Sequence, residues 1–487
     1  MTLNDLLILA VLLPMLNAII LPMFSRYQNI RECVIFVFAI STFLICGYVF
    51  FLQMLHFQGE FNFAFINKSI YFGLQSNKYN TLFALLVSFL WIVSTIYSIG
   101  YMRLHKESNQ TRFYSFFSLA IFATLGVAFS ANLLTSFLFY EILTISTIPL
   151  VAHNANGDNE KISQIKTYIY TLILTSVSLF FVAIILTIGF TGTSDYTEGG
   201  IFAKSKINPY IAIGILLLFM FGVAKVALMP FHKWLPSAMV APTPVSALLH
   251  AVAVVKSGAF ILFKIFVFIF GISYLQNLVN NLFSFNYLII IPSITIILAS
   301  VIALFQNNLK KRLAYSTISQ LSYIVLSLCV LTPTSSYASF LHIIAHAFSK
   351  IALFFAAGSI IVLSHKENVD ELNGIGRSLP ITMIAFSIGA LSLIGFPLTI
   401  GFTSKWFLIS GIFDSHNYIP LFVIMLSTLL NAIYFVPIIF KAFFEKPTDN
   451  HHTYKKSISM DIALVITSIC VVGFNVYSAF LVSLVIN

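Results

Sequence analysis

Long apolar runs separated by short polar breaks make up almost the whole chain. A helix that crosses a lipid bilayer needs roughly 20 consecutive apolar residues, and the runs are of that order. The candidate spans are residues 4–24, 33–53, 80–100, 113–130, 132–152, 164–190, 208–229, 244–266, 288–306, 315–332, 338–363, 379–411, 418–440 and 460–484. The pattern therefore predicts an all-α polytopic membrane protein with about 14 transmembrane helices.

The first apolar run predicts a retained helix rather than a secretory signal peptide. Residues 3–23 carry Asp5 in place of a basic leading region, and no Ala-x-Ala-like cleavage site follows them. The breaks between the later runs are short. We therefore expect no large extramembrane domain.

Basic residues predict how the chain is oriented. When the chain is threaded through the spans, 17 of its 26 Lys and Arg residues fall on one side, four on the other and five within spans. The positive-inside rule places the basic side in the cytoplasm. We expect a multi-pass protein of the cell (inner) membrane, surrounded by lipid, with both termini on the outer side. The same distribution accounts for the net charge of +10, so we expect no nucleic-acid partner.

Composition agrees with a membrane protein and limits its chemistry. Hydrophobic residues make up 59% of the chain and charged residues 9%, whereas soluble domains carry about 25% charged residues. The four cysteines are isolated within or beside apolar runs, which predicts packing roles. No Walker A run, strand-linked Gly-x-Gly-x-x-Gly motif or cysteine cluster is present. We expect no cofactor and no metal, and a protein driven by ion gradients or by partner subunits.

One interrupted stretch, residues 222–258, carries ionisable groups at unusual depth. Lys225, His250 and Lys256 lie in apolar sequence that is broken by Pro230, Pro236, Pro242 and Pro244. An ionisable group costs roughly 2.5–3.5 kcal/mol at the centre of a bilayer, so those present usually line an ion path. A broken helix at that depth is tolerated where protein or a water-filled cavity receives the freed backbone groups. The stretch therefore predicts a proton or cation conductor.

A second interrupted span predicts an inverted repeat. Residues 222–238 and 395–411 are both apolar, both contain Gly and Pro, and both carry a Lys-Trp pair. They lie five spans apart, so the second copy has the opposite topology, which is typical of transporter repeats. We expect two inverted five-helix repeats, each containing a broken helix. The predicted parts are 1–112 (three helices), 113–266 (first repeat), 288–440 (second repeat) and 441–487 (last helix).

Glu141, Lys225 and Lys256 are candidates for a proton relay in the first repeat. Glu141 is the only one of 16 Asp and Glu residues that lies well inside a span. A buried Glu facing a buried Lys can exchange a proton at modest cost. The alternatives are a Glu hydrogen-bonded to a neighbouring helix and lysines that extend to the interface. We predict that second role for Lys264, which lies near the end of its span.

The second repeat supplies four further candidates. His342, His346 and Lys350 follow i, i+4, i+8 spacing, so they share one helix face and predict a proton wire. Hydrogen bonding between helices is the alternative for the histidines, and a metal site lacks a nearby Cys or carboxylate. We interpret His250 as a relay or polar bridge, and Lys405 as the counterpart of Lys225 where the relay opens to water. Further polar groups of the span at 315–332, which we expect to hold water, are Ser316, Thr317, Ser319, Gln320 and Tyr323.

Several motifs together resemble the antiporter-like proton-translocating subunits. That family occurs in respiratory complex I, membrane-bound hydrogenases and multisubunit cation/proton antiporters. The resemblance covers about residues 110–440. The amino-acid sequence of residues 238–256 is most similar to that of the D-type subunit of the multisubunit monovalent cation/proton antiporter. The stretches that carry it are 230–250, 139–144, 308–320, 346–350 and 401–406.

The resemblance implies a fold and roles for the candidate residues. It implies fourteen helices with two inverted five-helix repeats, as the pattern predicts. It also implies an input pair, Glu141 with Lys225, a central link, Lys256 with His250, and an output side formed by His346, Lys350 and Lys405. Tyr140 stands where many complex I members have Trp, which favours the antiporter branch. Because the chain ends just after the last span, we expect no long lateral helix of the kind found in the largest members.

Three functions are compatible with these residues. The first is a proton-conducting subunit of a multisubunit Na⁺/K⁺–proton antiporter, assembled with other membrane subunits. The second is an M- or N-like subunit of complex I or a hydrogenase, which would be part of an oxidoreductase without a redox centre of its own. The third is a non-conducting scaffold, which the buried Glu and Lys residues disfavour because a scaffold would gain from replacing them with Leu.

Overall fold

The structure is a computed structural model of the chain that describes residues 2–67, 70–154, 157–447, 457–477 and 483. The chain forms two compact units, which we describe separately. Unit 1 comprises Met1–Ile92, Asn109–Trp234 and Ala253–Tyr287, and unit 2 comprises Val93–Ser108, Leu235–Val252 and Leu288–Asn487. Helix α3 (Lys78–Leu104) therefore contributes to both units.

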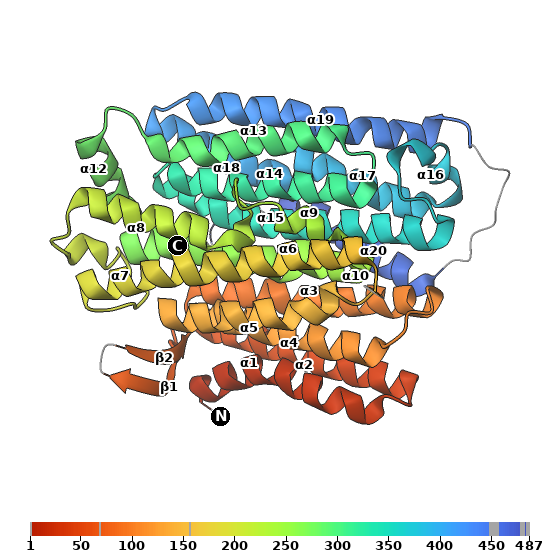
Figure 1. Ribbon diagram of the computed structural model, residues 1–487, viewed down its shortest axis with the longest axis horizontal. Coiled ribbons are helices and arrows are strands. Elements are labelled where there is room, and N and C mark those ends of the chain that lie inside the picture. The colour runs from red at the N-terminus through yellow and green to blue at the C-terminus, as the bar shows by residue number, and fades with distance from the viewer. Residues whose placement is uncertain (1, 68–69, 155–156, 448–456, 478–482, 484–487) are drawn as a thin grey trace. The chain divides into compact units, whose positions relative to one another are not determined.

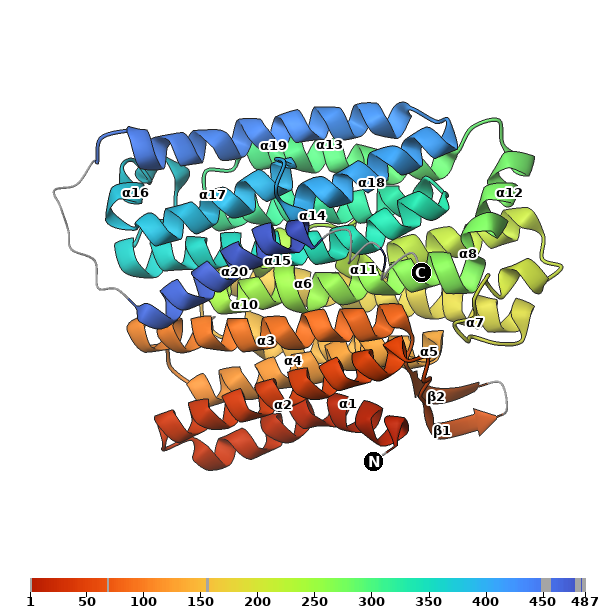
Figure 2. The same cartoon turned by 180° about the vertical axis from the view of Figure 1, so that it is seen from behind.

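Unit 1 is built of antiparallel helices and one β-hairpin. Helix α1 packs against α2 and α4, and α4 packs against α5, so these helices lie side by side in both views (Figures 1 and 2). Its elements are α1 (Leu3–Ile20), η1 (Leu21–Phe24), α2 (Gln28–Met54), β1 (Glu60–Asn67), β2 (Ile70–Gln75), α4 (Gln110–Phe129), α5 (Leu133–Val151), α6 (Asn159–Thr175), η2 (Ser176–Phe180), α7 (Phe181–Thr191), η3 (Phe202–Lys204), α8 (Pro209–Gly222), η4 (Ala224–Val226), α11 (Val254–Lys264), η7 (Ile265–Phe270) and α12 (Ile272–Leu282).

Unit 2 is organised around the long helix α15, which packs against α14, α17, α18 and α20. Helix α13 lies between α14 and α19 and contacts both. The elements of unit 2 are η5 (Ala238–Val240), α10 (Thr243–Ala247), η6 (Leu248–Val252), α13 (Ile290–Phe305), α14 (Leu309–Cys329), α15 (Pro333–Ser364), η9 (Val369–Glu371), α16 (Ile375–Ser378), α17 (Pro380–Ile394), α18 (Ile400–Ser415), α19 (Ile419–Phe444) and α20 (Ile458–Val476). Two short helices cross the unit boundaries, α9 (Trp234–Ser237) and η8 (Tyr287–Ile289).

Helix starts follow from local sequence. Thr2 and Asp5 form a capping box at α1, in which each side chain accepts a hydrogen bond from the other residue's backbone N–H. Thr332 caps α15, whose first residue is Pro333, a position where the missing N–H of proline costs nothing. Asp158 accepts hydrogen bonds from two backbone N–H groups at the start of α6.

The predicted all-α polytopic membrane fold is confirmed. Within the described residues, eleven helical segments are long and apolar enough to cross a membrane, and α8 and α17 are shorter apolar helices. Every predicted span coincides largely with helix, with interruptions inside 208–229 and 379–411, and the end of 460–484 (478–482 and 484) lies outside the described residues. The fourteen spans and the two repeats are consistent with this arrangement. The boundaries 1–112, 113–266, 288–440 and 441–487 stay predictions.

Two elements were missed by the search for long apolar runs. Strands β1 and β2 form an antiparallel hairpin after α2, and α12 is a short amphipathic helix. The hairpin lies at the end of unit 1 where α1 begins, and the backbone N–H of Glu60 donates to Asn4 there (Figure 1). The signal was available, because Phe61, Phe63 and Phe65 alternate with other residues, which is a strand period.

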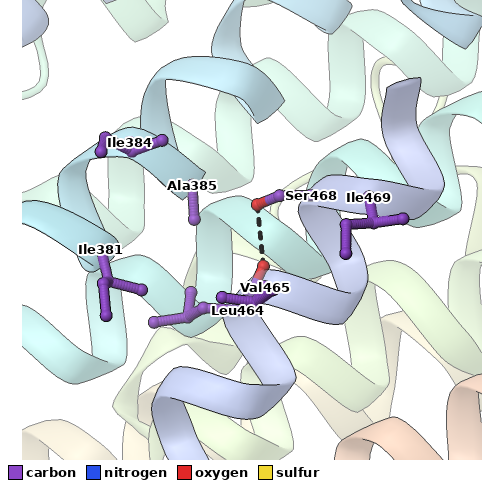
Figure 3. Close-up of a pocket in the computed structure, with 7 residues that line it drawn as sticks. All are labelled: Ile381, Ile384, Ala385, Leu464, Val465, Ser468 and Ile469. Atoms are coloured by element: carbon purple, nitrogen blue, oxygen red, sulfur yellow. Dashed lines mark hydrogen bonds between the residues drawn. The ribbon is translucent and has the colours of Figure 1, made fainter. Parts of the chain in front are cut away.

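Unit 2 has an apolar groove between helices α17 and α20. Ile381 and Ile384 of α17 face Leu464 and Ile469 of α20 (Figure 3). The hydroxyl of Ser468 donates to the carbonyl of Leu464 in its own helix at 2.7 Å. No residue that lines this groove is ionisable, so we place the candidate site elsewhere.

Candidate functional site

The first helix break holds Lys225 within it. Helix α8 ends at Gly222, the 3₁₀ turn η4 follows, and Ala227 adopts a left-handed conformation with φ 57°. The indole N–H of Trp234 donates to the freed carbonyl of Ala224 at 2.9 Å. The predicted broken helix is confirmed, and Lys225 lies within the break. The helix ends earlier than predicted because the Trp234 side chain satisfies a carbonyl of the turn.

The ammonium of Lys225 is surrounded by neutral acceptors. Its Nζ donates to the carbonyl of Tyr140 and to the hydroxyl of Thr144, each at 2.7 Å, and lies 3.0 Å from the centroid of the Tyr140 ring. The side chain is fully buried. The three N–H bonds of the ammonium therefore face a carbonyl, a hydroxyl and an aromatic ring, all supplied by α5.

Glu141 follows Tyr140 in α5, the helix that supplies all three of these acceptors. Among the described residues, no hydrogen-bond partner is found for its buried Oε1 atom. The predicted alternative, a carboxylate bonded to a neighbouring helix, therefore does not describe this oxygen. The structure places both members of the predicted input pair in unit 1, with Lys225 hydrogen-bonded to the residue that precedes Glu141.

Lys256 joins this pair from α11. It is the third residue of the helix and fully buried. Helix α11 packs closely on η4, because a Cβ atom added at Gly258 would lie 2.8 Å from the Cβ of Lys225. Unit 1 thus gathers three of the predicted relay residues, two of them fully buried. Their roles stay predictions.

His250 lies in a π-helical segment, η6, between α10 and α11. A π-helical turn is uncommon and often marks a functional position. His250 is fully buried in unit 2, with its ring centroid 4.6 Å from that of Phe354. The structure thus places His250 in a different unit from Lys256, its predicted partner in the central link.

The histidines of α15 share one face, as predicted. The rings of His342 and His346 are nearly parallel, with centroids 6.3 Å apart. His342 Nδ1 is 2.9 Å from the hydroxyl of Ser404, and its ring stacks on Tyr323 at 5.7 Å. Side chains that can exchange protons therefore form a column, which we call the histidine column: Tyr323 of α14, Ser404 of α18, and His342 and His346 of α15.

Lys350 continues this column with the acceptor arrangement seen at Lys225. Its Nζ donates to the carbonyl of Leu313 at 2.9 Å and to the hydroxyl of Ser316. Both acceptors come from one turn of α14. The amide of Gln320, one turn further, is buried, and neither its oxygen nor its nitrogen has a hydrogen-bond partner among the described residues. The polar face predicted for this span is therefore buried: Ser316, Thr317, Ser319, Gln320 and Tyr323.

Lys405 lies at the second helix break. Gly395 separates α17 from α18 with φ 94°, a conformation that glycine adopts without strain. Lys405 Nζ donates to the freed carbonyls of Leu393 and Ile394, at 2.8 Å and 3.0 Å. The residue is only 6% exposed, so its predicted opening to water stays a prediction.

Lys264 does not have the role that the sequence predicts. We expected an interfacial anchor, but the side chain is fully buried. Its Nζ donates to the carbonyl and the hydroxyl of Ser130, at 2.7 Å and 2.9 Å. The prediction was wrong because η7 continues the helix to Phe270, so Lys264 is well inside the packed helix.

The acceptors of the lysines were missed by the sequence analysis. Tyr140 and Thr144 are spaced i, i+4 on α5, and Leu313 and Ser316 are spaced i, i+3 on α14, so each pair shares a helix face, but only the packing of the helices shows that this face meets a lysine. Among the described residues, no group of three or more His, Cys, Asp or Glu is arranged to hold a metal.

The chain is similar to membrane subunits of known proteins. Residues 130–431 match the family described as "NADH:quinone oxidoreductase/Mrp antiporter, TM". NADH-quinone oxidoreductase subunit N of Desulforudis audaxviator (strain MP104C) is 30% identical over 364 residues, which cover 74% of this chain and 70% of that protein. NAD(P)H-quinone oxidoreductase subunit 5, chloroplastic, of Gossypium barbadense is 31% identical over 379 residues, covering 73% and 47%. The chain thus spans about half the length of that relative.

Two solved structures have the same fold. A chain of the membrane-bound sulfane sulfur reductase (MBS), an archaeal respiratory membrane complex, superposes with a TM-score of 0.84 at 24% identity, covering 98% of this chain and 96% of that chain. A chain of the Mrp complex from Dietzia sp. DQ12-45-1b superposes with a TM-score of 0.83 at 18% identity, covering 100% and 96%. With more than half of its length matched, the chain belongs to the family of NADH:quinone oxidoreductase/Mrp antiporter transmembrane subunits.

Proposed function

We propose that the chain is the proton-conducting subunit of a multisubunit monovalent cation (Na⁺ or K⁺)/proton antiporter. The observation that carries this is the environment of the buried lysines. Lys225, Lys350 and Lys405 donate to carbonyl and hydroxyl oxygens and to no carboxylate among the described residues. An ammonium that faces only neutral acceptors gives up its proton at a smaller free-energy cost than one paired with a carboxylate.

Charge coupling then moves protons between such sites. In this scheme a proton reaches Lys225, and the negative charge of Glu141, which follows Tyr140 in α5, would favour the protonated form. Protonation of Lys225 disfavours a second charge on Lys256, because like charges repel each other more strongly in a protein interior than in water. A change at the first lysine is thereby passed to the next one.

The second repeat provides the continuation. His250 and the column His342–His346 would carry the proton to Lys350 and Lys405, because imidazoles both accept and donate protons near neutral pH. The hydroxyl of Ser404 contacts the first of these rings at 2.9 Å. Other membrane subunits of the complex would supply the remaining route for the exchanged cation.

A second candidate is an M- or N-like subunit of complex I or a membrane-bound hydrogenase. The observation that favours it is the naming of the curated relatives, which are NADH-quinone or NAD(P)H-quinone oxidoreductase subunits at 30–33% identity. Such a subunit would move protons with the same residues, driven by redox partners. A scaffold is less well supported, because each buried lysine costs roughly 2.5–3.5 kcal/mol that a scaffold has no reason to spend.

The test is proton exchange in inverted vesicles that carry the complete complex. We expect added Na⁺ or K⁺ to dissipate a pre-formed pH gradient, and Lys225→Ala and Glu141→Ala to abolish that response while the complex still assembles. Lys204→Ala, which removes an exposed lysine of the same unit, is the matched control. Proton movement that requires NADH or another electron donor instead of a cation would support the second candidate. Exchange that survives both buried substitutions would show that the relay is wrong.

A further inference from the structure

Lys264 lies at one end of a hydrogen-bonded chain that the proposed relay does not use. Besides its two bonds to Ser130, its Nζ lies 4.0 Å from the centroid of the Tyr196 ring. The hydroxyl of Ser130 is 2.6 Å from that of Ser136, which is 2.7 Å from the hydroxyl of Tyr196. Four exchangeable groups therefore follow one another without a gap.

The chain is assembled from three separate segments of unit 1. Ser130 is the residue after α4, Ser136 lies in the first turn of α5, and Tyr196 belongs to the loop after α7. The backbone holds these segments in register, because Tyr196 N–H donates to the carbonyl of Ala131 at 3.1 Å and Leu133 N–H to that of Ser194 at 3.0 Å. The hydroxyls are thus positioned by the fold and not by flexible side chains alone.

This chain approaches the end of unit 1 that carries the β-hairpin. Ala131 N–H donates to the carbonyl of Gly73 in β2 at 2.9 Å. Asp195, the neighbour of Tyr196, is partly exposed, whereas Tyr196 itself is buried. The far end of the hydroxyl chain therefore lies next to a partly exposed carboxylate near the hairpin, on the side that the basic residues predict to be the outer one.

The environment of Lys264 matches that of Lys225. Each ammonium faces a backbone carbonyl, a hydroxyl and the ring of a tyrosine, and each is fully buried. Lys264 is also on the same helix as Lys256, eight residues later, or about 12 Å along the axis. Phe260 lies between the two, with its ring 5.5 Å from Lys264 Nζ.

We propose that Lys264, Ser130, Ser136 and Tyr196 form a proton-transfer branch that connects the buried lysines of unit 1 to water at the hairpin end. The Ser130 hydroxyl also donates to the carbonyl of Val127 at 2.8 Å, so it must first rotate toward Ser136. In one transfer, Lys264 then gives a proton to the Ser130 hydroxyl, which passes its own proton to Ser136. Ser136 passes its proton to Tyr196, and Tyr196 releases its phenolic proton to a water molecule. Lys264 is left as a neutral amine, and the charge on α11 that Lys256 senses is removed. This inference rests on the proposed function.

A buried anchor is the competing interpretation. An ammonium bonded to Ser130 would hold α11 against the end of α4 whether or not protons move. An anchor needs the Ser130 carbonyl and the face of the Tyr196 ring. It does not need the hydroxyls of Ser136 and Tyr196, so these two hydroxyls separate the interpretations.

The experiment measures cation-driven proton exchange in vesicles that carry the complete complex, normalised to the amount of assembled complex. Tyr196→Phe keeps the ring over Lys264 and removes its hydroxyl, and Ser136→Ala removes the link between the two ends. We expect each to slow exchange about tenfold or more, because each removes a proton-transfer group. Ser136→Thr keeps a hydroxyl at this position, so it should exchange at close to the wild-type rate. Thr124→Ala, which removes a buried hydroxyl bonded to its own helix, is the matched control and should leave the rate unchanged.

The outcomes are distinguishable from failure of the proposed function. If Lys225→Ala abolishes exchange but Tyr196→Phe and Ser136→Ala both exchange at the wild-type rate, the branch is wrong and Lys264 is an anchor. If the wild-type complex shows no cation-driven exchange, or Lys225→Ala retains it, the proposed function itself has failed. Slow exchange in both hydroxyl variants, with rescue by Ser136→Thr, supports the branch.

Discussion

Gly258→Ala tests whether the contact between α11 and the helix break places Lys225. The added Cβ would lie 2.8 Å from Lys225 Cβ and 3.1 Å from its carbonyl carbon. Carbon atoms prefer a separation of about 3.5–4.0 Å, so η4 must move by about 1 Å. A shift of that size would lengthen the 2.7 Å bonds from Lys225 Nζ to beyond hydrogen-bonding distance.

The expected loss is mainly one of activity. Overpacking costs about 1–3 kcal/mol, while replacing a helical Gly by Ala returns about 1 kcal/mol, so the change in stability is small. A misplacement of about 1 Å in a reacting group can cost about a hundredfold in rate. We therefore expect proton exchange in vesicles to fall strongly while the melting temperature of the complex changes little.

Gly214→Ala is the matched control. It also lies inside a helix of unit 1, α8, but a Cβ there would meet no atom within 4 Å. It should keep wild-type exchange and be neutral or slightly stabilising. If Gly258→Ala behaves like Gly214→Ala in both exchange and melting, the contact does not position Lys225 and our reasoning is refuted.

Three further predictions concern single side chains. Lys405→Ala leaves the two carbonyls freed at the second helix break without their donor, at about 1–3 kcal/mol for each buried group, so the melting temperature should fall; an unchanged value would contradict the bonding seen here. Lys350→Met replaces a buried cation with an apolar chain of similar length, so exchange should be lost while thermal stability is kept or raised, and a marked destabilisation would argue for a structural lysine. Glu371 accepts bonds from the backbone and side chain of Asn368, which holds its pKa below the ordinary value. This bonding favours the folded loop at neutral pH and is lost as the pH falls through the lowered pKa. The protection of the backbone amides of residues 367–372 against hydrogen exchange, relative to the intrinsic rate at each pH, should therefore fall only in acid, and Glu371→Gln should remove most of that pH dependence.

Much of the fold could be predicted from residue patterns because the bilayer imposes a length and a polarity on each helix. The broken helices were also predictable, since Gly and Pro interrupt apolar runs at both sites. The hairpin β1–β2 was not found, because a search for long apolar runs passes over an alternating segment of eight residues. Lys264 was misjudged for a related reason, as the run of apolar residues does not reveal where the helix ends in three dimensions.

The sequence by itself determined which apolar segments form helices, where the chain breaks and which helix face carries His342, His346 and Lys350, because these follow from local periodicity and from the cost of exposing polar groups to lipid. Only the tertiary structure decided what those residues touch. Tyr140 and Thr144 meet Lys225 from a helix more than 80 positions away, and Ser130 meets Lys264 across 134 positions. No local pattern encodes such distances, because side-chain contacts between helices depend on how whole helices pack. The neutral oxygens that accept hydrogen bonds from Lys225, Lys264, Lys350 and Lys405 are therefore a property of the packed fold.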